Sequence, residues 1–280
     1  MVNLNGQITS NSELLTPNNR AFAYGDGVFE TMKVVAGKIL FWEDHYLRLM
    51  ASMRIMRMEI PLSFTMDYLE QQIQDTVVAL NSTSPAYKAR ITVYRNEGGR
   101  YTPRVNTVSF VVVAEPIDSP FYLFSTDDYE IELFKDYYVN SGLLSTIKST
   151  NRAINILAGI FAQENDYHNC VLLNENKMVV EATNGNLFLV FGNTIKTPSI
   201  ESGCLRGVLR KQLLSMAKQL PEYQFEETSI SPFELQKADE IFITNVLVGI
   251  QPVTRYRKKT YQHQVAKDLH TKLQVKIRLG

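Results

Sequence analysis

Cysteine is scarce in this chain. Its 280 residues include only Cys170 and Cys204, which stand 34 positions apart. Two cysteines cannot form the disulfide framework of a small secreted protein, so we expect a reducing, cytoplasmic setting. The sequence also lacks a cluster of histidine, cysteine and acidic residues with zinc-like spacing, because His168 stands beside Cys170 alone. No metal is predicted.

Long apolar runs and an excess of one charge are absent too. Apolar runs such as 108–114 and 187–191 are much shorter than the roughly 20 residues of a membrane-spanning helix. Residues 1–4 lack the basic-then-apolar layout of a signal peptide. Lys plus Arg equals Asp plus Glu at 29 each, so no overall field favours nucleic acid or an anionic membrane. We expect a soluble protein with neither a nucleic-acid nor a membrane partner.

The glycine-rich loops that bind nucleotides are missing as well. Gly25-Asp26-Gly27 lacks the rest of the dinucleotide-binding fingerprint, and no Walker-type loop occurs. Nicotinamide and ATP are therefore poor candidates for a cofactor.

Residues 1–115 have the pattern of a smaller α+β domain. Asn5-Gly6 and Ala36-Gly37 predict the turns of two hairpins. Apolar residues at helical spacing predict two helices that cover one sheet face, and β-branched runs predict two further strands. The hairpins span 2–9 and 28–41, the helices 43–56 and 69–80, and the strands 87–94 and 107–114.

A larger, sheet-rich domain is predicted over residues 126–280. Residues 116–125 are expected to be the interdomain linker, because Pro116 and Pro120 suit an extended connector. The domain is expected to contain strands at 129–134, 170–173, 179–182, 186–191 and 240–244, helices at 152–164 and 207–220, and an amphipathic helical tail at 258–278. The expected fold class is a two-domain α+β and α/β arrangement, with Lys148 in the larger domain.

Lys148 and Glu181 are the most informative pair of residues. Lys148 lies in Ile147-Lys148-Ser149-Thr150-Asn151-Arg152, next to apolar stretches that can desolvate its amine and lower its pKa for attack on a carbonyl. Glu181 follows 33 residues later, and an acidic group at a pyridine nitrogen keeps the ring protonated as an electron sink. Together they suggest a pyridoxal-phosphate enzyme. A non-catalytic binding protein with the same fold would lack turnover.

Other segments are compatible with a phosphate and a substrate carboxylate. The guanidinium of Arg48 suits a phosphate, although local sequence favours a surface pair with Glu43 or Asp44. Residues 203–210 form a glycine-bearing turn into a helix, whose free N–H groups attract phosphate. Arg95 and Arg100 lie on a polar loop, where a carboxylate clamp and a solvated loop are equally plausible.

A strand end offers a further pair of polar groups. Thr244 and Asn245 follow the apolar run 240–243. Ligands commonly gather where strands end, although a plain strand terminus explains this pattern equally well.

Taken together, these segments resemble the class IV, or fold-type IV, pyridoxal-phosphate enzymes. This family includes branched-chain aminotransferases, D-amino-acid aminotransferases and aminodeoxychorismate lyases. The resemblance spans nearly the whole chain and is carried by six ordered segments: 20–31, 43–49, 147–152, 181–188, 206–210 and 238–247.

The resemblance implies a D-amino-acid-aminotransferase-like fold, with pyridoxal 5′-phosphate between two domains and a homodimer. It implies that Lys148 binds the cofactor covalently and shuttles the proton, and that Glu181 partners the ring nitrogen. The remaining implied cofactor-binding residues are Arg48, Asn184, Gly185, Val208, Leu209 and Thr244. Arg100 and Asn245 are implied to bind the substrate.

The chain looks most like aminodeoxychorismate lyase, a folate-pathway enzyme that eliminates pyruvate to give p-aminobenzoate. Branched-chain aminotransferases usually have a tyrosine five positions after the lysine, where this chain has Ala153. The loop 95–103 also lacks the arginine–x–histidine pair of one type of D-amino-acid aminotransferase. An aminotransferase acting on branched-chain L-amino acids or on D-amino acids stays the alternative.

Overall fold

The computed structural model describes residues 1–10 and 16–279. The chain separates into two compact units. Unit 1 consists of Met1–Pro120 and Ile147–Asn151, and unit 2 consists of Phe121–Thr146 and Arg152–Gly280.

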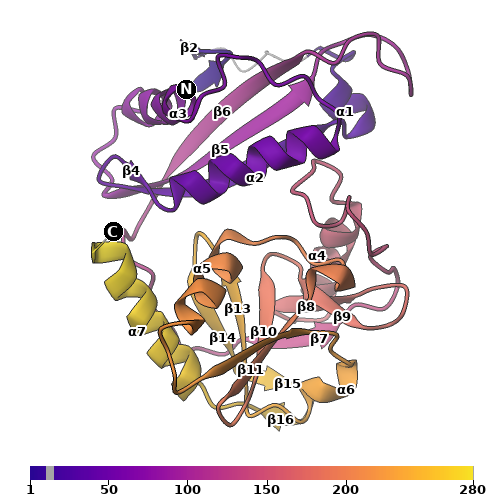
Figure 1. Cartoon of the computed structure of the whole chain (residues 1–280), viewed down its shortest axis with the longest axis vertical. Coiled ribbons are helices and arrows are strands. Elements are labelled where there is room, and N and C mark those ends of the chain that lie inside the picture. The colour runs from indigo at the N-terminus through magenta and orange to yellow at the C-terminus, as the bar shows by residue number, and fades with distance from the viewer. Residues whose placement is uncertain (11–15, 280) are drawn as a thin grey trace. The chain divides into compact units, whose positions relative to one another are not determined.

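Unit 1 is built on a six-stranded sheet with the strand order β2-β1-β6-β5-β3-β4 (Figure 1). Its strands are β1 (Val2–Leu4), β2 (Gln7–Thr9), β3 (Gly27–Val35), β4 (Lys38–Ile39), β5 (Ala86–Arg95) and β6 (Val108–Ile117). Both predicted hairpins are confirmed. Asn5 and Gly6 have φ of 52° and 92°, and Ala36 and Gly37 have φ of 49° and 77°, which are the positive values that a type I′ turn requires.

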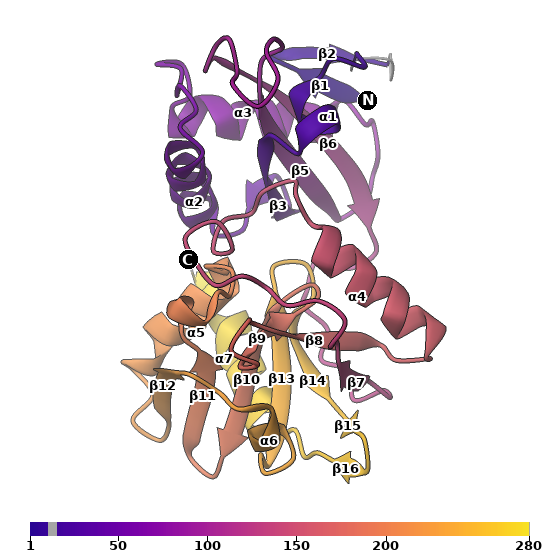
Figure 2. The same ribbon diagram turned by 90° about the vertical axis from the view of Figure 1, so that its right-hand side faces the viewer.

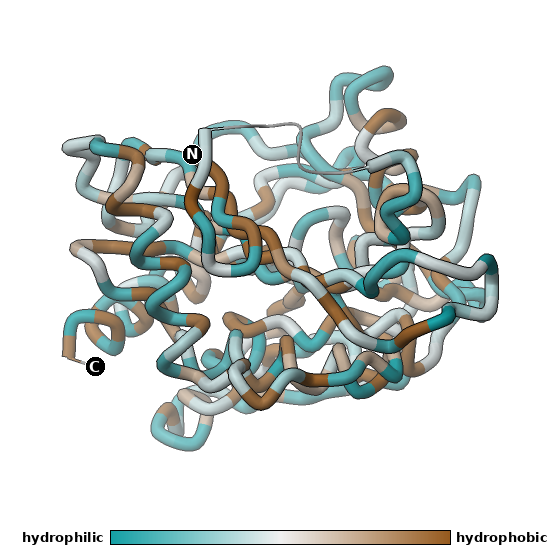
Figure 3. Tube along the Cα trace, turned by 90° about the horizontal axis from the view of Figure 1, so that it is seen from above, coloured by the Kyte–Doolittle hydropathy of each residue, from teal (hydrophilic) through white to brown (hydrophobic). Residues whose placement is uncertain are grey.

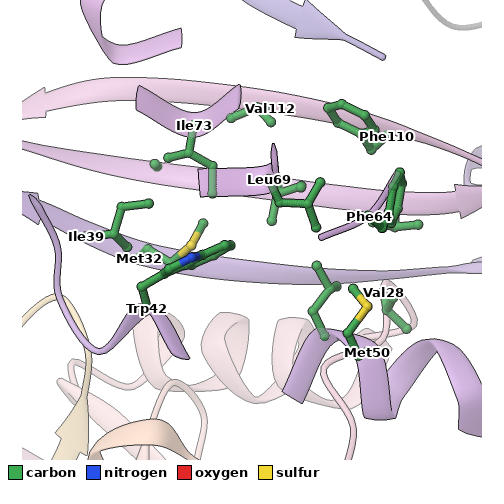
Figure 4. Packing of buried hydrophobic residues seen from close by; sticks show 14 of the residues in the cluster. Val28, Met32, Ile39, Trp42, Met50, Phe64, Leu69, Ile73, Phe110 and Val112 are labelled. Atoms are coloured by element: carbon green, nitrogen blue, oxygen red, sulfur yellow. The ribbon is translucent and has the colours of Figure 1, made fainter. Parts of the chain in front are cut away.

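Two helices cover one face of this sheet. α2 (Trp42–Ile55) packs on β3, and α3 (Met66–Val78) packs on β6, while the short α1 (Arg20–Tyr24) precedes β3. Figure 4 shows apolar side chains from these helices and strands meeting in one layer, with Val28, Met32, Trp42, Met50, Leu69, Ile73, Phe110 and Val112 among them. Burial of such side chains stabilises the unit by about 25 cal/mol per Å² of apolar surface.

The predicted linker begins too early, because β6 extends to Ile117. Pro116 pairs with Tyr87 of β5. A proline has no N–H for a second neighbour, but β1 covers only residues 111–113 of β6. Position 116 is thus locally at a sheet edge among the described strands, where proline is tolerated.

The lysine segment belongs to unit 1, whereas the sequence placed it in the larger domain. Val28 and Ser149 form an isolated antiparallel bridge. The N–H of Phe29 donates to the Lys148 carbonyl at 2.8 Å, and the N–H of Thr150 donates to the Gly27 carbonyl at 2.9 Å. These backbone bonds attach the segment to the start of β3.

Unit 2 contains two five-stranded sheets that share an apolar core (Figure 2). The first sheet has the order β12-β11-β10-β13-β14 and the second β16-β15-β7-β8-β9. The strands are β7 (Glu130–Leu133), β8 (Asn169–Leu173), β9 (Val179–Ala182), β10 (Asn186–Phe191), β11 (Thr194–Pro198), β12 (Gln224–Thr228), β13 (Glu240–Asn245), β14 (Gly249–Val253), β15 (Arg255–Tyr256) and β16 (Lys259–Thr260).

The helices of unit 2 surround these sheets. α4 (Ala153–Glu164) packs on β8, α5 (Val208–Ala217) on β12 and β13, and α7 (Gln264–Leu279) on β13 and β14. The shorter elements are α6 (Pro232–Leu235) and the 3₁₀ helix η1 (Ile200–Ser202). The predicted tail helix begins too early, because Tyr256 and Lys259 pair across a turn in which Arg257 has a φ of 56°.

Figure 3 colours the Cα trace by hydropathy and shows hydrophobic (brown) and hydrophilic (teal) stretches alternating along the chain. No helix within the described part of the chain combines the length and apolar character needed to cross a membrane.

Candidate functional site

Lys148 lies half-buried on the strand-like segment beside β3 in unit 1. Its carbonyl accepts the Phe29 N–H, which fixes the backbone, and its Nζ lies 4.7 Å from the centre of the Phe29 ring. An aromatic face attracts the ammonium form, and the partial burial removes water from the amine. The structure thus gives Lys148 a fixed backbone and a partly desolvated amine.

Arg48 forms a buried cluster with Glu30 and His45. The Arg48 Nε and Nη2 donate to the two Glu30 carboxylate oxygens at 2.7 and 2.6 Å, and His45 Nδ1 lies 2.7 Å from Glu30 Oε2. The Arg48 side chain is 10% exposed, so it is not the surface arginine that local sequence favours. A bidentate pair holds the guanidinium plane in one orientation.

The electrostatics of this cluster favour a charged carboxylate beside a neutral imidazole. Burial raises the pKa of Glu30, but the charge and hydrogen bonds of Arg48 and the His45 hydrogen bond outweigh it and lower the pKa to about 2. Burial lowers the pKa of His45, against the hydrogen bond and charge of Glu30, and the positive charges of Arg48 and Lys148 lower it further. Glu30 is therefore the anion that balances the cations around it.

Glu181 lies in β9 of unit 2 and is buried. Its Oε2 accepts the Leu205 N–H at 2.9 Å. β10, the next strand along the chain, contributes Asn186, whose Nδ2 donates to the Leu205 carbonyl at 2.9 Å. The Leu205 N–H is thereby tied to Glu181 and the Leu205 carbonyl to Asn186, which holds one oxygen of the Glu181 carboxylate in place.

The N-terminus of α5 follows this turn directly. Val208 and Leu209 are its first two residues, and Gly207 provides no side-chain cap. Their backbone N–H groups have no partner inside the helix. A Cβ on Gly207 would overlap the Asn186 Oδ1 atom, so glycine allows the helix start to approach Asn186. The helix end therefore presents an anion-binding set of amides.

Thr244 lies beside this helix start. It pairs in register with Asn186, and its side chain is buried. Among the described residues, its Oγ1 has no hydrogen-bond partner. Because a buried hydroxyl without a partner costs about 1–3 kcal/mol, this atom calls for a ligand.

Gly185 and Asn184 occupy the turn between β9 and β10. A Cβ on Gly185 would lie 2.5 Å from the Thr244 carbonyl oxygen and 2.7 Å from Ile243 Cγ2, so only glycine fits. The Asn184 side chain is exposed, and its Oδ1 accepts Asn169 Nδ2 at 2.8 Å. Asn184 is thus anchored to unit 2.

Asn245 ends β13 and forms a turn with its own side chain. Its Oδ1 accepts the N–H groups of Leu247 and Val248 at 3.1 and 3.0 Å. The carboxamide oxygen therefore shapes the loop after the strand, and a substrate role for Asn245 stays a prediction.

The structure separates the two arginines of the 95–103 loop. Arg95 is buried, and its Nε, Nη1 and Nη2 donate to Asp26, Asn106 and the carbonyls of Met56 and Arg57. Its guanidinium is fully engaged inside unit 1. Arg100 is exposed on the loop. Arg100 is therefore the better candidate for a substrate carboxylate.

The sequence alone did not indicate a role for Glu30. A signal was present, because Glu30 lies in a largely apolar strand, where a buried carboxylate is stable only beside a cation. The Leu205 N–H was not predicted either, because no sequence signal identifies a backbone donor. Each unit thus holds part of the predicted set, Lys148 with Arg48 in unit 1 and the other cofactor-binding residues in unit 2.

Comparison with known families decides what this set of residues represents. A family model described as amino-transferase class IV matches residues 27–256. The chain belongs to the class IV aminotransferase family. The enzymes of this family are pyridoxal-phosphate-dependent aminotransferases and lyases, so the chain is a pyridoxal-phosphate enzyme of one of these kinds. The resemblance seen in the sequence is confirmed.

Individual relatives of this class IV enzyme have different activities. An aminodeoxychorismate lyase of Vibrio harveyi is 26% identical over 239 residues, covering 84% of this chain and 85% of the relative. A D-alanine aminotransferase of Bacillus licheniformis is 26% identical over 263 residues, covering 89% and 86%.

A solved structure supports the fold. The branched-chain aminotransferase of Thermoproteus uzoniensis, determined with norvaline, matches with a TM-score of 0.87 at 23% identity, covering 99% of this chain and 94% of that one. At this identity the likeness shows the fold alone, and the expected fold-type IV architecture is confirmed.

The residues of this class IV enzyme fit the cofactor. The α5 amides and the Thr244 Oγ1, which has no partner in the described part of the chain, are suited to phosphate oxygens, which accept hydrogen bonds. The buried Glu181 carboxylate is suited to a protonated ring nitrogen, and the Lys148 amine to covalent attachment.

Proposed function

We propose that the chain is a 4-amino-4-deoxychorismate lyase, which produces pyruvate and p-aminobenzoate for folate synthesis. The observation that carries this choice is Ala153, which begins α4 where branched-chain aminotransferases usually have a tyrosine. The loop 95–103 supports it, because it lacks the arginine–x–histidine pair of one D-amino-acid aminotransferase type.

In this proposal, different residues of the chain bind different parts of the cofactor. Arg48, the Val208 and Leu209 N–H groups and the Thr244 hydroxyl bind the phosphate. Asn184 and Gly185 lie beside the ring, and Glu181 keeps the ring nitrogen protonated. Bound pyridoxal phosphate supplies an electron sink for the charge that forms on the substrate.

Lys148 is the proposed base of the reaction. Its Nζ removes the proton from the substrate ring carbon that bears the amine. The electron pair left behind completes the aromatic ring as the bond to the enolpyruvyl oxygen breaks. The departing enolpyruvate takes up a proton at its methylene carbon, so the products are pyruvate and p-aminobenzoate. Arg100 holds a substrate carboxylate, and Asn245 is the second proposed substrate contact.

The test is product release by the purified holoenzyme. We expect 4-amino-4-deoxychorismate to give pyruvate and p-aminobenzoate in equal amounts, and Lys148→Ala to abolish both. Lys135→Ala removes an exposed lysine of unit 2 and serves as the matched control. If neither product forms while the protein is yellow through Lys148, the lyase proposal is wrong.

An aminotransferase is the second candidate, and the D-alanine and branched-chain relatives support it. Lys148, Glu181 and the phosphate-binding groups would have the same roles up to removal of the substrate proton. Incubation with D-alanine, L-leucine or L-valine distinguishes the two candidates, because an aminotransferase releases the matching keto acid.

We also propose that the enzyme is a cytoplasmic homodimer. The scarcity of cysteine supports the compartment, and the family resemblance supports the dimer. The exposed apolar face of α4, formed by Ile156, Leu157 and Ile160, is a suitable surface for a second copy.

A further inference from the structure

Two buried arginines share one buried carboxylate in unit 1. Arg20 Nε donates to Asp26 Oδ2 at 2.8 Å, and Arg95 Nε donates to the same oxygen at 3.0 Å. All three residues are at most 9% exposed. Removing one partner of such a buried cluster leaves uncompensated charge, so the three groups are held together strongly.

The arginines bind the 96–107 loop at two places. Arg20 Nη1 donates to the carbonyls of Gly98, Gly99 and Arg100 at 3.2, 3.4 and 2.8 Å, which ties down the loop tip. Arg95 Nη1 donates to Asn106 Oδ1 at 2.6 Å, which ties down the returning arm. Asp26 therefore links the two anchors of one loop.

The loop backbone is shaped for this attachment. Gly98 and Gly99 have φ of 117° and 78°, conformations that other residues rarely adopt. The Arg104 N–H closes the tip by donating to the Gly98 carbonyl at 3.3 Å. With its backbone held from inside, the loop presents the Arg100 and Tyr101 side chains outward, and Tyr101 is 94% exposed.

An aromatic contact ties the outer side of the loop to α1. The Tyr24 and Tyr101 rings lie 6.0 Å apart at 62°, and the Arg20 guanidinium lies 4.9 Å from the Tyr24 ring centre. Arg20 thus binds the carbonyls of the loop tip and also packs against Tyr24, one member of the aromatic pair.

We propose that Arg20 and Asp26 are positioning residues for Arg100. They hold the loop backbone in advance, so that the Arg100 guanidinium meets the substrate carboxylate without an ordering cost at binding. This inference rests on the proposed function, because Arg100 is given its substrate role there. It assigns to the Arg20–Asp26 pair an effect on substrate affinity and none on cofactor attachment.

The test uses the holoenzyme and the variant Arg20→Lys. Lysine retains the charge beside Asp26 but lacks the planar fork that reaches both the carboxylate and the carbonyls. We expect faster hydrogen exchange of the amides in 96–107, an increase in KM on the order of tenfold, and kcat and cofactor absorbance close to those of the wild type. Arg54→Lys, at an exposed position of α2, is the matched control.

A double-mutant cycle with Arg100→Ala separates positioning from general damage. In the Arg100→Ala background, Arg20→Lys should leave KM within about twofold, because the loop has nothing left to position. If the two substitutions raise KM by factors that multiply in the double variant, the proposal is wrong. It is also wrong if Arg20→Lys leaves the hydrogen exchange of the loop amides unchanged. Asp26→Asn provides a second variant if Arg20→Lys does not fold.

The two proposals can fail separately. A wild-type holoenzyme that releases no pyruvate and p-aminobenzoate from 4-amino-4-deoxychorismate would refute the proposed function. Loop exchange needs no turnover, so it still decides whether Arg20 and Asp26 hold the loop.

Discussion

Glu30 is the residue on which the buried guanidinium of Arg48 depends. It accepts both Arg48 donors and faces His45, and it is almost fully buried. We expect Glu30→Gln to reduce the free energy of unfolding by about 3–5 kcal/mol, because Arg48 loses its buried counter-charge. Urea unfolding measures this change. Glu59→Gln, at an exposed position, should stay within about 0.5 kcal/mol of the wild type.

The same residue predicts a pH dependence of stability. The pKa of Glu30 is lowered from 4.5 to about 2 in the folded protein. Its contribution is therefore fully present above pH 4.5 and is lost as the pH falls toward 2, since the unfolded state then binds the proton first. The stability difference between wild type and Glu30→Gln should shrink below pH 4.5. An equal difference at pH 7 and pH 3 would contradict this sign.

Several site residues were identifiable from the sequence, and their partners were not. Lys148 and Glu181 stood out because a lysine and an acid in those contexts match one cofactor chemistry. Arg48 looked like a surface residue because its partner, Glu30, lies 18 positions away on a strand. Arg95 and Arg100 looked equivalent in the sequence, and only tertiary contacts separate the buried anchor from the exposed group.

At the scale of elements, the start of α5 leaves no room for a side chain at Gly207. A Cβ at Gly207 would lie 1.8 Å from Asn186 Oδ1, so either the helix start or the buried Asn186 side chain would have to shift. We expect Gly207→Ala to weaken pyridoxal-phosphate binding about tenfold, because the α5 amides would move away from the phosphate. Spectrophotometric titration of the apoenzyme measures this affinity. Gly142→Ala, where a Cβ meets nothing within 4 Å, should bind normally.

Local patterns predicted elements well where periodicity and turn chemistry agreed. The Asn5-Gly6 hairpin, α2 and α3 follow from such agreement. The strands β11, β12 and β14 were missed. β11 and β12 pair in parallel although α5 separates them in the sequence, and a short stretch of sequence does not reveal a strand partner that far away. The tail helix was placed too early because the β15–β16 hairpin is only two residues long in each strand.

At the scale of the molecule, the sequence did not predict which unit contains the lysine segment. Residues 147–151 lie between stretches of unit 2 in the sequence, yet they belong to unit 1. The reason is a pairing between Val28 and Ser149, which are 121 positions apart. A domain boundary placed from composition assumes that each domain is one continuous stretch of sequence. Such a boundary cannot identify a short segment that returns to the other unit.

The proposed dimer makes a prediction about α4. Ile156 and Ile160 are 62% and 44% exposed on an apolar helix face. We expect Ile156→Glu with Ile160→Glu to shift the protein from dimer to monomer in sedimentation velocity, because charges in an apolar interface are desolvated without partners. Gln163→Glu, which adds a charge at an exposed polar position of α4, should leave the dimer intact. A wild-type protein that sediments as a monomer would contradict the proposal.

The most direct measurement on the catalytic centre is covalent trapping of the cofactor. Borohydride reduction of the yellow holoenzyme, followed by tryptic digestion and mass spectrometry, should place one phosphopyridoxyl group on Lys148. Trypsin does not cleave after a modified lysine, so the label should appear in the peptide 136–152. A label on any other lysine, or a protein that retains no cofactor after reduction, would contradict the role given to Lys148.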